Sequence, residues 1–174
     1  MNFEDFARVN GEPFNIVSQQ TVFSQGRQSS SLYIVNEGIL RTTYVTPEGK
    51  EHIKSFVLAG DVIGSLSAIH GGGKCSFSLI SCMPCKLTRL SIGDVYSASR
   101  KHLDIASAMI DILIAYGSKK ERREYELLCL TAEERYRLML KNAREIVDSV
   151  PQQQIALYLG ITPVALSRIK KRIA

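Results

Sequence analysis

The residues with the clearest chemical potential lie at the C-terminal end of the sequence, where basic side chains are concentrated. Arg168, Lys170, Lys171 and Arg172 fall within five positions, and no carboxylate follows Asp148. A guanidinium can donate two hydrogen bonds to guanine, and an ammonium can neutralise a backbone phosphate. A polyanion such as double-stranded DNA is therefore a candidate partner of this segment.

The charge of the whole chain supports the same interpretation. The net charge is +5, and residues 119–174 hold 12 of the 22 Lys and Arg residues but only 7 of the 17 Asp and Glu residues. The first 118 residues are therefore neutral overall, and the excess lies at one end. A solvated basic helical tail would give the same imbalance, so charge alone leaves both interpretations open.

Two short helices joined by a tight turn would position these basic residues. Pro151 suits the first turn of a helix, and Gly160 can end that helix with a positive φ. Thr162 suits the N-cap of the next helix, with Pro163 at its first position. The pattern predicts a helix-turn-helix, although a helical hairpin that only packs on the body remains the alternative.

The second of these helices has one apolar and one polar face. At about 100° per residue, Leu166, Ile169 and Ile173 share a face, and Val164, Arg168 and Lys171 lie opposite. The candidate DNA-binding residues are Thr162, Pro163, Val164, Ser167, Arg168, Lys170, Lys171 and Arg172.

The first half of the chain consists of short apolar runs separated by turn residues. Such runs, with turns about every 8–12 residues, predict an antiparallel sandwich or barrel. The segment from Thr46 to Gly49 suits a type I turn. The predicted strands cover residues 15–17, 21–23, 32–35, 39–45, 52–58, 77–81 and 87–90.

From about residue 91 the apolar spacing becomes helical. Ser91 with Asp94 resembles a helix N-cap, and Thr131 with Glu134 forms a capping box. The helix between them has two apolar stripes, which predicts contact with the β-rich part on one side and with a second copy of the chain on the other. The alternative is that other parts of the same chain cover both stripes. The candidate dimer residues on this helix are Ile105, Met109, Ile112 and Tyr116.

The order of these parts resembles the CRP/FNR family of bacterial transcription regulators. The resemblance also rests on glycine-containing segments at residues 25–26, 31–38, 49–51 and 58–64. It implies an α+β fold with an N-terminal antiparallel β-roll, which is a double-stranded β-helix like the cyclic nucleotide-binding domain. A long central dimerisation helix and a small C-terminal helix-turn-helix domain would follow. The implied domains are 1–97, 98–128 and 129–174, with a link near 127–131.

The same resemblance implies a homodimer that binds near-palindromic DNA, with RNA polymerase as a possible further partner. The family's effector pocket has Gly-Glu-Leu and, eleven residues after its Gly, Arg-Ser/Thr-Ala. Here Ser65 and Cys75 replace the Glu and Arg that bind the ribose and the cyclic phosphate. We therefore expect no tight binding of cyclic AMP, and either another small effector or none. The candidate pocket residues are Gly64, Ser65, Leu66, Lys74, Cys75 and Ser76.

Two further expectations concern the C-terminus and the thiols. The sequence ends at Ala174, directly after the second helix, so we expect the β-wing of many family members to be absent. This motivates a competing hypothesis, a sensory or interaction module that no longer binds specific DNA. Cys82 and Cys85 form a CxxC close to Cys75, so a thiol-based sensor also stays open beside a role as small core residues.

Other functional classes lack their signatures. The sequence contains no nucleophile elbow, phosphate loop or paired metal-binding histidines, so we expect neither an enzyme nor a metal site. No apolar run is long enough to span a membrane, and the first residues do not resemble a signal peptide. We therefore expect a cytoplasmic protein with reduced thiols.

Overall fold

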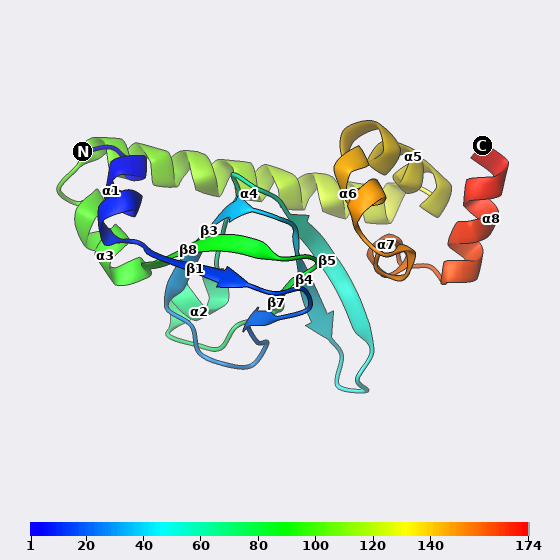
Figure 1. Ribbon diagram of the computed structural model, residues 1–174, viewed down its shortest axis with the longest axis horizontal. Coiled ribbons are helices and arrows are strands. Elements are labelled where there is room, and N and C mark those ends of the chain that lie inside the picture. The colour runs from blue at the N-terminus through cyan, green and yellow to red at the C-terminus, as the bar shows by residue number, and fades with distance from the viewer. Residues whose placement is uncertain (174) are drawn as a thin grey trace.

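The strands of the N-terminal half form two antiparallel sheets in the computed structural model, which describes residues 1–173 (Figure 1). The order is β1-β8-β3-β6 in one sheet and β2-β7-β4-β5 in the other. The strands are β1 (Glu12–Ile16), β2 (Thr21–Phe23), β3 (Ser31–Glu37), β4 (Leu40–Val45), β5 (Glu51–Val57), β6 (Val62–Ile63), β7 (Ser78–Ser81) and β8 (Cys85–Ser91).

The two sheets enclose an apolar core. Leu40, Leu79 and Leu87 are completely buried, and the ring of Phe23 lies 5.4 Å from that of Phe77. Alternate residues of a strand point to opposite faces, so short strands can each supply two or three side chains to this core. The predicted antiparallel β-roll is confirmed. The two-residue strand β6 was missed because its apolar run is too short to show a period.

The predicted turn at residues 46–49 is confirmed as the connection between β4 and β5. The Gly49 N–H donates to the Thr46 carbonyl oxygen at 2.9 Å, and Gly49 has a φ of +83°. Gly38, between β3 and β4, has a φ of +95°. A Cβ there would lie 2.5 Å from the Cys85 Sγ, so this turn also needs the space that glycine leaves.

The helices of the first part are α1 (Phe3–Asn10), α2 (Leu66–Gly71), α3 (Ile92–Ser99) and α4 (Leu103–Cys129). The Ser91 N-cap is confirmed, since its Oγ accepts from the Asp94 N–H at 3.4 Å. The central helix begins at Leu103 rather than at residue 98, because residues 100–102 form a turn after α3. Figure 1 shows α4 running along one side of the β-roll, from α1 and α3 at one end to the C-terminal helices at the other.

The C-terminal helices are α5 (Ala132–Asn142), α6 (Arg144–Ser149), α7 (Gln152–Leu159) and α8 (Pro163–Ile173). The capping box of α5 is confirmed. The Thr131 N–H donates to Glu134 Oε2 at 2.8 Å, and the Glu134 N–H donates to Thr131 Oγ1 at 3.3 Å. The chain turns between α4 and α5, which is where the sequence predicted the link.

The C-terminal helices pack on the β-roll rather than standing apart from it. Ile53 and Phe56 of β5 share one hydrophobic cluster with Ile155, Leu159 and other residues of α5–α8. The ring of Phe56 lies 5.2 Å from that of Tyr158 in α7. Because this core crosses the link at 127–131, the three-domain division remains a prediction.

Candidate functional site

The turn between α7 and α8 has the geometry predicted from its residues. Gly160 has a φ of +71°, and its N–H bonds back to carbonyl groups of α7. Thr162 Oγ1 accepts from the Ala165 N–H at 3.2 Å, which caps α8. Ile155 and Leu159 of α7 are completely buried. The two helices therefore form the expected helix-turn-helix.

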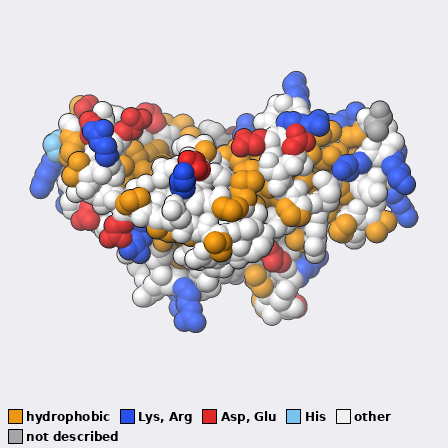
Figure 2. Space-filling model, in the orientation of Figure 1, with side chains coloured by type: hydrophobic (Ala, Val, Ile, Leu, Met, Phe, Trp, Pro, Cys, Tyr) orange, Lys and Arg blue, Asp and Glu red, His pale blue; other side chains and the backbone are white. Residues whose placement is uncertain are grey.

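The outer face of α8 is basic, and its inner face is apolar. Leu166 and Ile169 are buried, whereas Val164 is 62% exposed. Ser167, Arg168 and Lys171 are also exposed. Figure 2 shows Lys and Arg side chains gathered at the end of the molecule where Figure 1 places α8.

The four basic residues of α8 fall into two pairs. Arg172 forms an ion pair with Glu133 of α5 at 2.9 Å, and Lys170 Nζ donates to Gln152 Oε1 of α7 at 3.1 Å. Within residues 1–173, Arg168 and Lys171 have no side-chain hydrogen bond or ion pair. Sequence spacing could not show which two basic residues have protein partners, because the partners of Lys170 and Arg172 come from other helices.

The two segments of the predicted effector pocket meet in the structure. Ser65 Oγ accepts from the Ser76 N–H at 3.2 Å and lies 3.1 Å from Ser67 Oγ. Gly64 is tightly enclosed, since a Cβ there would lie 2.8 Å from Leu32 Cδ2. The two segments that the family resemblance implies for the pocket therefore lie side by side, and their role as a ligand site stays a prediction.

These segments offer a ligand little charge. Ser65 and Cys75 are each 2% exposed, so both side chains are packed inward. Burial raises the pKa of the Cys75 thiol, which keeps it neutral. Lys74 and Leu66 point outward and are exposed. Nothing here replaces the bidentate guanidinium that a cyclic phosphate needs.

The candidate dimer residues of α4 differ in exposure. Ile105 is completely buried beside Phe6 and Val95, which leaves it no surface for a second chain. Met109, Ile112 and Tyr116 are half-buried. A more exposed apolar stripe was not among the candidate dimer residues, because helical spacing alone cannot show which side of the helix the β-roll covers. We call this the outer stripe of α4, and it comprises Leu103, Ile110, Leu113, Ile114, Tyr125 and Leu128.

The cysteines of the CxxC lie in the protein interior. Cys82 and Cys85 are buried free thiols, and burial raises the pKa of Cys82 to about 11. No group of three or more His, Cys, Asp or Glu residues within 1–173 could hold a metal ion. Over the same described residues, no helix is both long and apolar enough to cross a membrane. Ala174, and with it the question of a wing, lies outside the described residues.

Comparison with known proteins identifies the family. The model of the cyclic nucleotide-binding domain matches residues 14–102. The fumarate and nitrate reduction regulatory protein of Shigella dysenteriae is 29% identical over 171 residues, and that of Salmonella typhi is 26% identical over 163 residues. Both alignments cover 88% of this chain, which spans 65% of the length of each relative.

Solved structures have the same fold. FixK2 from Bradyrhizobium japonicum superimposes with a TM-score of 0.81 at 18% identity, covering 94% of this chain and 84% of its own. The c-di-GMP responsive regulator CLP from Xanthomonas campestris gives a TM-score of 0.78 at 16% identity, covering 98% and 89%. With its β-roll, long helix and helix-turn-helix, this chain belongs to the CRP/FNR family and carries a cyclic nucleotide-binding domain.

Proposed function

We propose that the protein is a cytoplasmic, homodimeric transcription regulator that binds DNA through α8. The observation that carries the proposal is the outer face of α8, where Arg168 and Lys171 are exposed without protein partners among residues 1–173. Its buried face, with Leu166 and Ile169, fixes the helix on the body. This leaves the basic face to enter a major groove.

The side chains of α8 suit different parts of a DNA duplex. The guanidinium of Arg168 can fork onto O6 and N7 of guanine, and Val164 can contact a thymine methyl group. Lys171 can neutralise a phosphate. Lys170 and Arg172 hold α8 against α7 and α5, so their contribution to DNA binding comes partly from positioning the helix.

The outer stripe of α4 supports the homodimer. A helix that leaves Ile110 57% and Ile114 62% exposed is stabilised when a second copy covers it. A twofold dimer would present two copies of α8 to half-sites about one helical turn apart. The target is therefore a near-palindrome.

The structure of the effector segment favours a regulator that does not respond to cyclic AMP. With Ser65 and Cys75 buried and uncharged and Lys74 pointing outward, the two segments place no guanidinium against a cyclic phosphate and no carboxylate against a ribose. The candidate ligand-binding and DNA-binding residues include no set suited to catalysis, which supports a regulator rather than an enzyme.

The test is selection of random duplex DNA by the purified protein, with and without cyclic AMP. We expect enrichment of a near-palindrome in both conditions. Arg168→Ala should weaken binding to that site by about 1–3 kcal/mol, whereas Arg27→Ala, which removes an exposed arginine from the β-roll, should not. Equal effects of the two substitutions would reject the assignment of α8, and no enrichment would favour the sensory or interaction module.

A further inference from the structure

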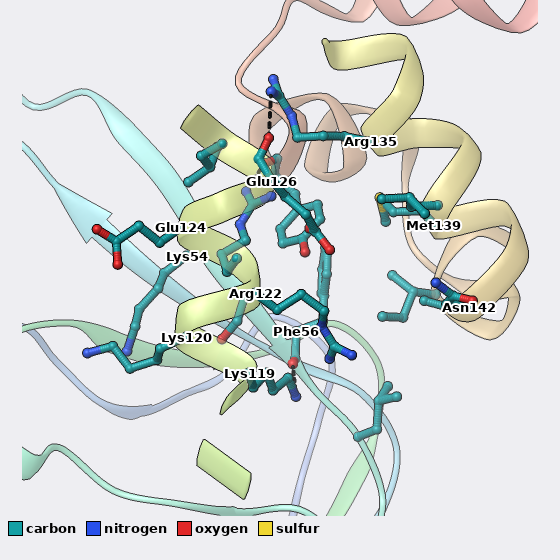
Figure 3. A pocket seen from close by; sticks show the side chains of 18 of the residues that line it. Lys54, Phe56, Lys119, Lys120, Arg122, Glu124, Glu126, Arg135, Met139 and Asn142 are labelled. Atoms are coloured by element: carbon teal, nitrogen blue, oxygen red, sulfur yellow. Dashed lines mark hydrogen bonds between the residues drawn. The ribbon is translucent and has the colours of Figure 1, made fainter. Parts of the chain in front are cut away.

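A cavity lined by basic residues lies where β5, α4 and the C-terminal helices meet (Figure 3). Its volume is about 580 Å³, which is within the range of small-molecule sites. Phe56, Met139 and Tyr158 contribute apolar surface. The charged residues that line it are Lys54, Lys119, Lys120, Arg122, Arg123 and Arg135, with Glu124 and Glu126 as the carboxylates.

Arg123 is one of the cations in the wall of this cavity, and its guanidinium is only partly satisfied by hydrogen bonds. Its Nη2 donates to the Tyr158 carbonyl oxygen, but its Nε and Nη1 are buried without a hydrogen-bond partner in the described residues. A buried N–H group without an acceptor is costly, and a charged one is more so. Neither Glu124 nor Glu126 forms an ion pair with it within residues 1–173. Arg123 therefore adds positive charge to the wall of the cavity, while its Nε and Nη1 stay enclosed by the protein.

Lys54 and Lys120 add positive charge at one end of the cavity, where Figure 3 shows their side chains close together. Lys54 Nζ donates to the Tyr116 hydroxyl at 3.0 Å and lies 4.0 Å from the Phe77 ring centroid. Over residues 1–173, neither lysine has a carboxylate partner. Lys119 differs, because Asp61 neutralises it at 3.0 Å.

We propose that this cavity binds an organic anion, in which a carboxylate, sulfonate or phosphate group is carried on an apolar body. The cations would hold the charged group, and the apolar wall would hold the body. The site is distinct from the segments at 64–66 and 74–76, because none of those residues lines it. Its lining comes from β4, β5 and α4 to α7, so its occupant touches both the β-roll and the helix-turn-helix.

The probe for this site is 8-anilinonaphthalene-1-sulfonate, a fluorescent aromatic anion, compared with N-phenyl-1-naphthylamine, which lacks the sulfonate. We expect the sulfonate probe to bind saturably at one site per chain and the neutral probe to bind at least about tenfold more weakly. Similar affinity for both probes, or no saturable binding, would overturn the proposal, because the cavity would then not select an anion.

Charge reversal locates the binding site. Lys120→Glu with Arg122→Glu changes two exposed cations of the lining, and we expect it to weaken the sulfonate probe by about tenfold or more. Lys50→Glu with Lys101→Glu makes the same charge change outside the lining and should have little effect. Equal weakening by both pairs would show only a general charge effect and would overturn the proposal. Lys120→Ala repeats the test if the double variant does not fold. The measurement uses no DNA, so its result is independent of the proposed DNA binding.

Discussion

The guanidinium of Arg123 in α4 stacks on the ring of Tyr158 in α7, with 3.7 Å between the guanidinium carbon and the ring centroid. The centroid of the same Tyr158 ring lies 5.2 Å from the ring centroid of Phe56 in β5. One tyrosine of the helix-turn-helix is therefore held by both the long helix and the β-roll. These contacts add to the shared hydrophobic cluster that joins the C-terminal helices to β5.

The first prediction concerns the strength of that contact. Arg123→Ala removes a cation–π pair and a charged hydrogen bond to the Tyr158 carbonyl oxygen. We expect it to lower the free energy of unfolding by about 1–2 kcal/mol, measured by urea denaturation. Arg122→Ala, at the exposed neighbouring position, should change it by less than about 0.5 kcal/mol. If both variants lost the same free energy of unfolding, the stacking of Arg123 on Tyr158 would contribute no measurable stability.

The second prediction concerns the outer stripe of α4. Ile114→Glu should convert the proposed dimer to a monomer in analytical ultracentrifugation, because the twofold axis would bury a charge from each chain. Val9→Glu makes the same kind of change at an exposed apolar position on α1 and should leave the dimer intact. A dimer that survives Ile114→Glu would move the interface away from this stripe.

The features that sequence reasoning predicted correctly are local ones. The N-cap at Thr162, the left-handed Gly160 and the capping box at Thr131 each depend on residues within four positions, so spacing was sufficient. The pairing of the segments at Ser65 and Ser76 was found because the resemblance to a known family supplied the long-range contact.

The features that could not be predicted from the sequence depend on packing between distant segments. Ile105 has the spacing of an interface residue but is covered by α1 and α3, whose contacts no helical period contains. The sequence cannot show that Arg172 and Lys171 have different roles, because the ion pair of Arg172 with Glu133 appears only in the structure. The cavity likewise joins Lys54, Arg123 and Tyr158, which are far apart in the chain.

The third prediction concerns the pH dependence of stability. Burial, together with the charge of Lys120, lowers the pKa of Lys54 from 10.5 to about 8. Between these values the unfolded chain binds more protons at this site than the folded one, so the contribution of Lys54 to the free energy of unfolding increases with pH. Raised thiol and phenol pKa values act in the opposite direction, so the comparison must be with a variant.

Lys54→Met provides that comparison. The difference in free energy of unfolding, wild type minus variant, should become more positive between pH 7.5 and about 9.5 in urea denaturation. Lys50→Met, at an exposed position on the preceding turn, should show no such trend. A difference that is flat with pH would mean that the Lys54 ammonium is not desolvated.

The last prediction separates a core role of the cysteines from a thiol sensor. Cys75, Cys82 and Cys85 are buried, and burial raises the pKa of each thiol, whereas Cys129 is exposed. Since the thiolate is the reactive form, a disulfide reagent at pH 7.5 should modify one thiol rapidly and three only after unfolding. Cys129→Ser should abolish the fast phase of the reaction. Three thiols should still react after the protein is unfolded with denaturant. Rapid reaction of Cys82 or Cys85 in the folded protein would instead support the sensor, because a core thiol has neither the access nor the charge to react at that rate.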